Sequence, residues 1–277
     1  MKFLIGIITY NRINYLKNLI TTWEATRSKS DKWIFIVADD RSTDGSIEYI
    51  EGLSFDKSVI IKNIILNKRD GVHHQVNQVL KYASSIDFDI GFMVEDDAYF
   101  KRPGWDILYA KAIKLSGYDH MCFFDGDSCL KLRGTRCSKA KKIVINKKKI
   151  QCEINNCFNT FGCFWTFTHR VIKKVGYFDL QHFGLTGSGH TDYSKRCCQA
   201  RFNNYDPFFD ALNSQNYVGT ICDNYIQSCC GEEPGLIEKA STYNIPTYKY
   251  NTIARNDRMY VPYNELPYDM NRKEKIR

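Results

Sequence analysis

The chain has 277 residues, of which 43% are hydrophobic, 14% aromatic and 25% charged, with a formal net charge of +8. This length suits a single α/β domain with a substantial core, and the mixture of apolar residues and both charge signs excludes a largely disordered chain. The basic balance favours anionic partners, such as nucleotide phosphates or an anionic membrane surface.

The hydrophobic segments are short. The apolar run from Phe3 to Ile8 is too short for a signal peptide, and no stretch reaches the roughly 18 apolar residues of a membrane span. The eleven cysteines lack zinc-finger spacing, and the vicinal pairs Cys197-Cys198 and Cys229-Cys230 are awkward for ordinary disulfides. We therefore expect a soluble cytoplasmic protein with mostly reduced cysteines.

Short apolar runs alternate with segments of helical periodicity through the first half of the chain. A helix is predicted to begin at Pro103, because proline suits the first helical position. Alternating strands and helices predict an α/β fold with a mostly parallel sheet flanked by helices. The other expected elements of this half are strands over 3–8, 33–37, 59–66 and 90–94, and helices over 16–23, 47–50 and 72–83.

The second half of the chain is less regular. Strands are predicted over His120 to Phe124 and Phe164 to Phe167, and a helix from Asp192 to Phe202. Six lysines from Lys139 to Lys149 flank a short apolar run. This segment is either a solvated hairpin or a surface for an acceptor or an anionic membrane. It lacks the aromatic interleaving of a site that reads bases, so no nucleic-acid partner is expected.

Polar clusters follow three of the predicted strands, namely Thr9 to Arg12, Asp39 to Arg41 and Glu95 to Asp97. Ligands of parallel sheets bind beyond the carboxyl ends of the strands, so we expect these clusters to form one site. In a strand, Glu95 and Asp97 point to the same side. Mg²⁺ and Mn²⁺ prefer carboxylate and phosphate oxygens, and the acidic cluster therefore indicates a metal site. A solvated turn is the alternative interpretation.

The order of these motifs resembles the GT-A fold and the family 2 glycosyltransferases. Thr9-Tyr10-Asn11-Arg12 follows the first strand, and Asp39-Asp40-Arg41-Ser42-Thr43-Asp44-Gly45-Ser46 follows the second. Asn67, Gly71 and Asn77 come next, with the spacing of a family segment, before the acidic motif. The Glu-Asp-Asp form of that motif is also similar to the N-acetylglucosaminyltransferase I group. The resemblance extends over about residues 3–200.

The resemblance implies a role for each matched residue. Asp97 is expected to ligate Mn²⁺ or Mg²⁺, with Glu95 as a further candidate ligand, and the metal to bridge the donor phosphates. Asp40 is expected to hydrogen-bond the base of the donor, and Asp96 to contact the ribose or the sugar. The full set of expected donor-binding residues is Thr9, Tyr10, Asn11, Arg12, Asp40, Arg69 and Asp96.

The catalytic base is where the sequence departs from the family's pattern. Gly176-Tyr177-Phe178-Asp179 resembles a turn of the family that usually precedes an E-D-x-D-L motif, but Gly189-His190-Thr191-Asp192-Tyr193 follows here. Aligning Asp192 with the last Asp of the motif puts His190 where the base usually lies. His190 is the base or a further metal ligand. Asp192 is the base or the N-cap of the next helix.

These observations predict a GT-A-like domain over residues 1–210, with a nucleotide-sugar half over 1–100, an acceptor half over 101–210 and an extension over 211–277. The predicted reaction is metal-dependent transfer of a sugar, with inversion implied by the resemblance. The donor is expected to be a UDP-sugar and the acceptor a hydroxyl of a glycan or glycoconjugate. The alternatives are a sugar nucleotidyltransferase, and a non-catalytic nucleotide-sugar-binding module, which the departure near residue 190 favours.

Overall fold

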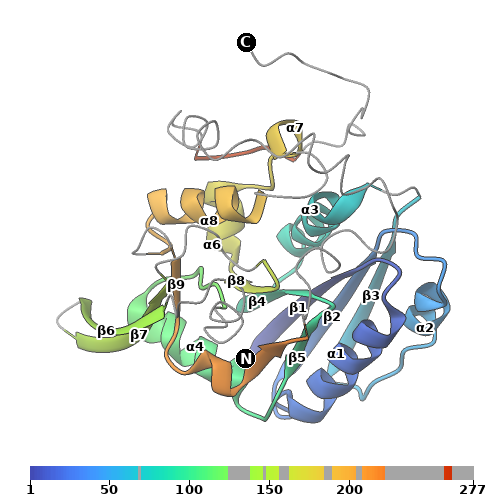
Figure 1. Cartoon of the computed structure of the whole chain (residues 1–277), viewed down its shortest axis with the longest axis horizontal. Coiled ribbons are helices and arrows are strands. Elements are labelled where there is room, and N and C mark those ends of the chain that lie inside the picture. The colour runs from blue at the N-terminus through green and yellow to red at the C-terminus, as the bar shows by residue number, and fades with distance from the viewer. Residues whose placement is uncertain are drawn as a thin grey trace.

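A computed structural model describes residues 1–67, 70–123, 138–145, 148–155, 162–183, 189–203, 208–221 and 259–263. For the strands between residues 138 and 155, and for residues 181, 182 and 208, the structure describes the backbone but not the side chains. A central sheet runs through the molecule, with α1 and α2 on one side and α3 on the other (Figure 1).

The central sheet has five strands in the order β3-β2-β1-β4-β8. Four of them run parallel, β1 (Lys2–Thr9), β2 (Lys32–Asp39), β3 (Val59–Ile65) and β4 (Ile90–Glu95), whereas β8 (Phe164–Phe167) is antiparallel to β4. Helices cover both faces, so the inner strands read as continuous apolar runs rather than alternating ones. The prediction of a mostly parallel sheet flanked by helices is confirmed.

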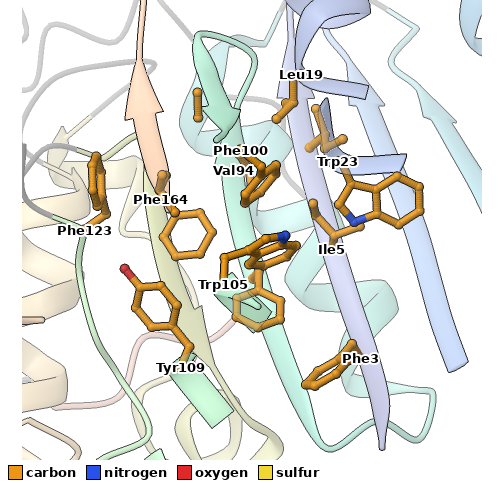
Figure 2. Close-up of a cluster of buried hydrophobic side chains, with 14 of the residues drawn as sticks. Phe3, Ile5, Leu19, Trp23, Val94, Phe100, Trp105, Tyr109, Phe123 and Phe164 are labelled. Atoms are coloured by element: carbon orange, nitrogen blue, oxygen red, sulfur yellow. The ribbon is translucent and has the colours of Figure 1, made fainter. Parts of the chain in front are cut away.

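Alternate residues of β1 point to opposite faces of the sheet and divide the core in two. On one face, β1 packs with α1 (Ile13–Thr26), α2 (Ser46–Glu51) and α4 (Trp105–Ser116) around a group of aromatic rings (Figure 2). The rings of Phe100 and Trp105 stack there with their centroids 4.1 Å apart. Large buried rings dominate the packing energy of such a layer.

The opposite face of the sheet packs against α3 (Gly71–Ser84), α6 (His169–Val175) and α8 (Gly189–Gln199). Leu4 and Ile8 of β1 belong to this second cluster. The two helices α3 and α8 thus reach the same face of the sheet, although they come from the two halves of the chain. This face therefore brings the predicted donor half and the predicted acceptor half together.

Two smaller sheets complete the described structure. β5 (Ala98–Phe100) pairs with β10 (Val218–Thr220), while β6 (Ser138–Ile145), β7 (Lys148–Asn155) and β9 (Phe208–Ala211) form an antiparallel sheet. β10 lies beyond residue 210, where the extension was predicted to begin, and its pairing with β5 packs it onto the body of the domain. The remaining short elements are α7 (Leu180–Phe183) and η1 (Ser214–Asn216).

The lysine-rich segment forms the β6–β7 hairpin, which protrudes from the body of the domain (Figure 1). The side chains of the hairpin lie outside the described residues, so its role as an acceptor or membrane surface stays a prediction. Among the helices that the structure describes, none is both long and apolar enough to cross a bilayer.

Several predicted element bounds are wrong. The helix predicted over Asp192 to Phe202 is α8, which spans Gly189–Gln199. α4 begins at Trp105 rather than at Pro103, because Gly104 adopts a left-handed conformation (φ 95°) that ends the preceding turn. The strand predicted over 120–124 is reduced, within 120–123, to an isolated bridge at Cys122. The backbone donors of this segment bind three separate partners, the carbonyls of Phe202, Phe209 and Phe164, so they form no continuous ladder.

Candidate functional site

The acidic cluster lies where β4 ends, beside the end of β1. The register of the two strands places Ile8 opposite Glu95, so Thr9 and Asp96 are next to each other. The Thr9 hydroxyl donates to Asp96 Oδ2 over 2.7 Å, and Arg12 Nη1 lies 2.7 Å from Asp96 Oδ1. Two of the three predicted strand-end clusters therefore meet in direct contact.

Asp97 is less well satisfied than its neighbour Asp96. Its Oδ2 lies 3.8 Å from Arg12 Nη2, and its Oδ1 is buried without a hydrogen-bond partner. The residue is only 3% exposed. An anionic oxygen that is shielded from water and unpaired is costly, and such atoms in native proteins call for a specific explanation. A bound cation would supply the missing partner.

The pKa values of the cluster reveal a local shortage of positive charge. Burial, together with the neighbouring charges of Asp97 and Asp96, raises the pKa of Glu95 to about 8. Burial also raises the pKa of Asp96 to about 7, against the opposing effect of Arg12. The pKa of Asp97 is raised by burial too, although Arg12 counteracts the shift. One guanidinium thus offsets only part of the negative charge that these three carboxylates bring together.

Two kinds of metal site can be considered, one enclosed by protein ligands alone and one completed by substrate phosphates and water. Within the residues that the structure describes, no group of three or more His, Cys, Asp or Glu side chains is arranged to enclose a metal ion. Mg²⁺-type sites often need only one or two carboxylates, because substrate phosphates and water supply the other ligands. Asp97, with its unpartnered Oδ1, fits the second kind.

The second polar cluster, which follows β2, holds the chain where α3 begins. Asp40 Oδ1 accepts from the Asp70 amide over 2.7 Å, and its Oδ2 accepts from the Gly71 amide over 2.9 Å. Gly71 has a left-handed backbone (φ 79°), which explains the glycine of the matched motif. Asp40 therefore fixes the start of α3, and its contact with a base stays a prediction. Arg69 lies outside the described residues.

Asn11 joins the first cluster to the second. Its backbone N–H donates to Ser42 Oγ over 2.8 Å, and its side-chain oxygen accepts from the Thr43 amide over 2.6 Å. Its own backbone is left-handed, with φ at 48°, a conformation that asparagine tolerates better than most residues. Tyr10, beside it, is half-buried. All three predicted clusters thus form one connected rim at the carboxyl ends of the strands.

Gln75 belongs to this site but was missed by the motif analysis. Its amide nitrogen donates to the carbonyl of Thr9 over 2.6 Å and to that of Ala38 over 2.8 Å. It thereby ties the end of β1 to the end of β2. A glutamine on the apolar stripe of a predicted helix is the signal that could have revealed it, because buried amides need partners.

Asp192 is compensated within its own helix. It is the fourth residue of α8, so the alternative that it is the N-cap of this helix is wrong. Arg196, one turn later, places Nε 2.7 Å from Asp192 Oδ2. The same guanidinium donates to the carbonyls of Val175 and Tyr177 over 2.6 and 2.8 Å. Asp192 and Arg196 are both 3% exposed, and they form a buried ion pair that binds α8 to the turn after α6.

His190 faces the acidic cluster across a glycine. A Cβ added at Gly162 would lie 3.0 Å from Glu95 Oε1 and 3.4 Å from His190 Nδ1. Gly189, next to His190 in the chain, packs still more closely against the ring of His73, with 2.6 Å between its ideal Cβ position and the ring. The half-buried imidazole of His190 is thereby brought to the acidic edge of the sheet, although it lies far from that edge in the sequence.

His120 anchors the other side of α8. Its Nδ1 lies 2.9 Å from the Thr166 carbonyl oxygen, and its Nε2 lies 2.9 Å from Ser194 Oγ. Burial lowers the pKa of His120 to about 4, so the ring is neutral at physiological pH. This side chain is a structural tie between β8 and α8.

Comparison with known proteins defines the class. Residues 4–176, more than half of the chain, match the family described as Glycosyl transferase family 2. The chain belongs to this family, and it is a glycosyltransferase. An uncharacterized glycosyltransferase of Acanthamoeba polyphaga mimivirus is 26% identical over 226 residues, which are 79% of this chain and 80% of that protein. The family assignment decides against the nucleotidyltransferase alternative.

Solved structures support the fold. S. aureus TarS in complex with UDP matches with a TM-score of 0.52 and 17% identity, over 71% of this chain and 55% of that chain. The mannosyltransferase PcManGT from Pyrobaculum calidifontis, in complex with GDP-Man and Mn²⁺, matches with a TM-score of 0.51 and 14% identity, over 72% and 52%. The chain thus spans about half the length of these proteins. The predicted GT-A-like fold is confirmed.

Proposed function

We propose that this glycosyltransferase transfers a hexosyl or N-acetylhexosaminyl group from a UDP-sugar to a hydroxyl of a glycan or glycoconjugate, with inversion and with a divalent cation. The observation that carries the proposal is the buried, unpartnered Oδ1 of Asp97 beside an under-neutralised acidic cluster. TarS was solved with UDP, and PcManGT with GDP-Man and Mn²⁺, which supports a donor and metal of these classes.

Asp97 would hold the cation, with Glu95 as a second candidate, in the manner of the Glu-Asp-Asp motif of the N-acetylglucosaminyltransferase I group. When bound, Mn²⁺ or Mg²⁺ supplies charge stabilisation to the departing nucleoside diphosphate. Thr9 and Arg12 fix Asp96 at the rim, where it can accept from the ribose or the sugar. Asp40, whose carboxylate accepts from the amides of Asp70 and Gly71, would hydrogen-bond the base of the donor.

His190 is the base that the geometry favours. A base must take the proton from the acceptor hydroxyl as that oxygen attacks the anomeric carbon. Asp192 is buried, and its Oδ2 is engaged by Arg196 within the fold. His190 is half-buried and shares the gap at Gly162 with Glu95, which lies in the acidic cluster. Its position therefore suits proton transfer beside the donor.

The proposal is tested by nucleoside diphosphate release with a panel of UDP-sugars and GDP-Man, each with and without Mn²⁺. We expect release with at least one UDP-sugar, its loss on chelation of the metal, and its loss in Asp97→Ala. Asp44→Asn is a matched carboxylate control, because Asp44 binds the amides of Ile13 and Ser46 within the loops. Release that continues undiminished in Asp97→Ala would refute the metal role of this residue.

The choice of base is tested separately with His190→Gln and Asp192→Asn. Single-turnover transfer at saturating donor and metal isolates the chemical step. We expect His190→Gln to slow this step by about 100-fold or more, the usual contribution of general base catalysis. Asp192→Asn should slow it much less once the variant is shown to be folded. The reverse ranking would assign the base to Asp192.

A further inference from the structure

Arg12 occupies the position between the acidic cluster and an aromatic ring. Its guanidinium lies 2.7 Å from Asp96 Oδ1, 3.8 Å from Asp97 Oδ2 and 4.4 Å from the centre of the Tyr15 ring. The ring of Tyr15 lies one helical turn further along α1 and is partly exposed. The guanidinium is therefore held from two sides by residues of the chain itself.

Asp96 has both carboxylate oxygens engaged by this arrangement. Oδ1 pairs with Arg12, and Oδ2 accepts from the Thr9 hydroxyl. A cation that approached Asp96 would have to displace a charge-assisted contact that is already buried. Asp97 has no such restriction, because its Oδ1 has no partner and its Oδ2 lies beyond hydrogen-bond distance of Arg12.

We propose that Arg12 is a positioning residue that reserves Asp97 for the metal and makes metal binding depend on the donor diphosphate. This inference rests on the proposed function. Without a donor, a divalent cation at Asp97 must bind close to the fixed positive charge of Arg12, which repels it. A diphosphate brings negative charge that offsets both cations, so that metal and donor strengthen each other's binding.

The sign of the expected effect separates this role from a purely structural one. If Arg12 merely supported the shape of the site, its removal would weaken metal binding in every state. If Arg12 repels the metal in the donor-free protein, replacing it with a neutral side chain strengthens metal binding there. The same replacement also reduces the gain in metal affinity that the nucleotide provides. Without Arg12, there is no repulsion of the metal left for the diphosphate to offset.

The experiment measures Mn²⁺ binding by titration calorimetry, with and without saturating UDP. The variants are Arg12→Gln, Arg12→Lys, which keeps the charge, and Thr9→Val, which removes the other contact of Asp96 without changing charge. In the unaltered protein, UDP should tighten Mn²⁺ binding by about tenfold or more, the usual range of coupling between two ligands. Arg12→Gln should bind Mn²⁺ about tenfold more tightly without UDP and lose most of the UDP effect.

Arg12→Lys should retain the UDP effect, and Thr9→Val should retain most of it. The inference is overturned if Arg12→Gln weakens Mn²⁺ binding in the absence of UDP, or if its UDP effect equals that of the unaltered protein. A different failure, in which the unaltered protein binds no Mn²⁺ even with UDP, would overturn the proposed metal dependence itself. The two failures are thus distinguishable.

Discussion

Asp97 and Asp192 make an informative pair, because both are carboxylates of the predicted site, one as metal ligand and one as base, and both are 3% exposed. They differ in what surrounds them. Asp97, at the end of β4, has an oxygen without a partner, and the nearest guanidinium nitrogen lies 3.8 Å from its other oxygen. Asp192, inside α8, contacts Arg196 at 2.7 Å.

The difference teaches that charge compensation, rather than burial or residue type, is what distinguishes the two carboxylates. A buried acid that is paired within the fold gains nothing from a ligand, whereas an unpaired one gains a partner when a cation binds. At the edge of the sheet from Glu95 to Asp97, negative charge exceeds the positive charge that surrounds it. In α8, the charge of Asp192 is matched by that of Arg196. His190 of this helix is half-buried and faces the acidic edge.

Asp97→Asn should have the largest effect on activity and should sharpen this comparison most. We expect donor-dependent nucleoside diphosphate release to fall on the order of 1,000-fold, because a metal ligand contributes several kcal/mol to the transition state. The free energy of unfolding of the metal-free protein should stay equal or rise, since an uncompensated buried charge is removed. Urea denaturation measures the second quantity. A large loss of stability would show that Asp97 is structural.

Arg196→Met should mainly reduce stability, in contrast to Asp97→Asn, which should mainly reduce activity. It leaves Asp192 buried without its partner, and breaking such a pair typically costs about 3–5 kcal/mol of unfolding free energy. Adding Asp192→Asn to Arg196→Met should recover part of this loss, because the unpaired charge disappears. The measurement is the urea midpoint of each variant. Equal stabilities for Arg196→Met and the unaltered protein would contradict the structural role of the pair.

Gly162→Ala probes the gap between Glu95 and His190. The added methyl would lie 3.0 Å from Glu95 Oε1 and 3.2 Å from His190 Cγ, so these side chains must move apart. We expect the transfer rate to fall about tenfold, because small displacements of catalytic groups are costly. Gly52→Ala at the end of α2 is the control, where the nearest atom is a carbonyl oxygen at 3.4 Å. Similar transfer rates for Gly162→Ala and Gly52→Ala would show that the spacing of Glu95 and His190 does not affect catalysis.

The smallest effect concerns the pH dependence of stability. The pKa of His120 is lowered to about 4, below its ordinary value of 6.5, so the unfolded chain binds the proton more readily. His120 therefore contributes stability above pH 6.5, and this contribution is lost progressively as pH falls from 6.5 towards 4. The expected loss between about pH 7.5 and about pH 5.5 is about 1 kcal/mol.

The control for this prediction is His120→Gln, measured at the same pH values. Glu95 and Asp96 have raised pKa values, and these act in the opposite direction, stabilising the metal-free protein as pH falls. Subtracting the variant's profile removes their contribution. An identical pH dependence in the variant and the unaltered protein would exclude His120 as the source.

Part of the site could be predicted from the sequence because it depends on local pattern and on one rule of topology. Apolar runs of strand length indicated β1 to β4, and parallel strands bring their carboxyl ends to one edge. The contact of Thr9 with Asp96 follows from that edge. The four-residue spacing of Asp192 and Arg196 was also readable as a possible helical ion pair, a signal that the motif comparison overlooked.

Other features were decided only by the tertiary structure. Sequence periodicity indicates which side chains are buried, but not which distant group compensates a buried charge. The reach of Arg12 to Asp96 and the meeting of His190 with Glu95 at Gly162 depend on chain segments that are remote in sequence. The sequence thus determined the residues that gather at the edge of the sheet. The packing of α1 and α8 around that edge left one oxygen of Asp97 without a hydrogen-bond partner and paired Asp192 with Arg196, because charge compensation depends on three-dimensional proximity.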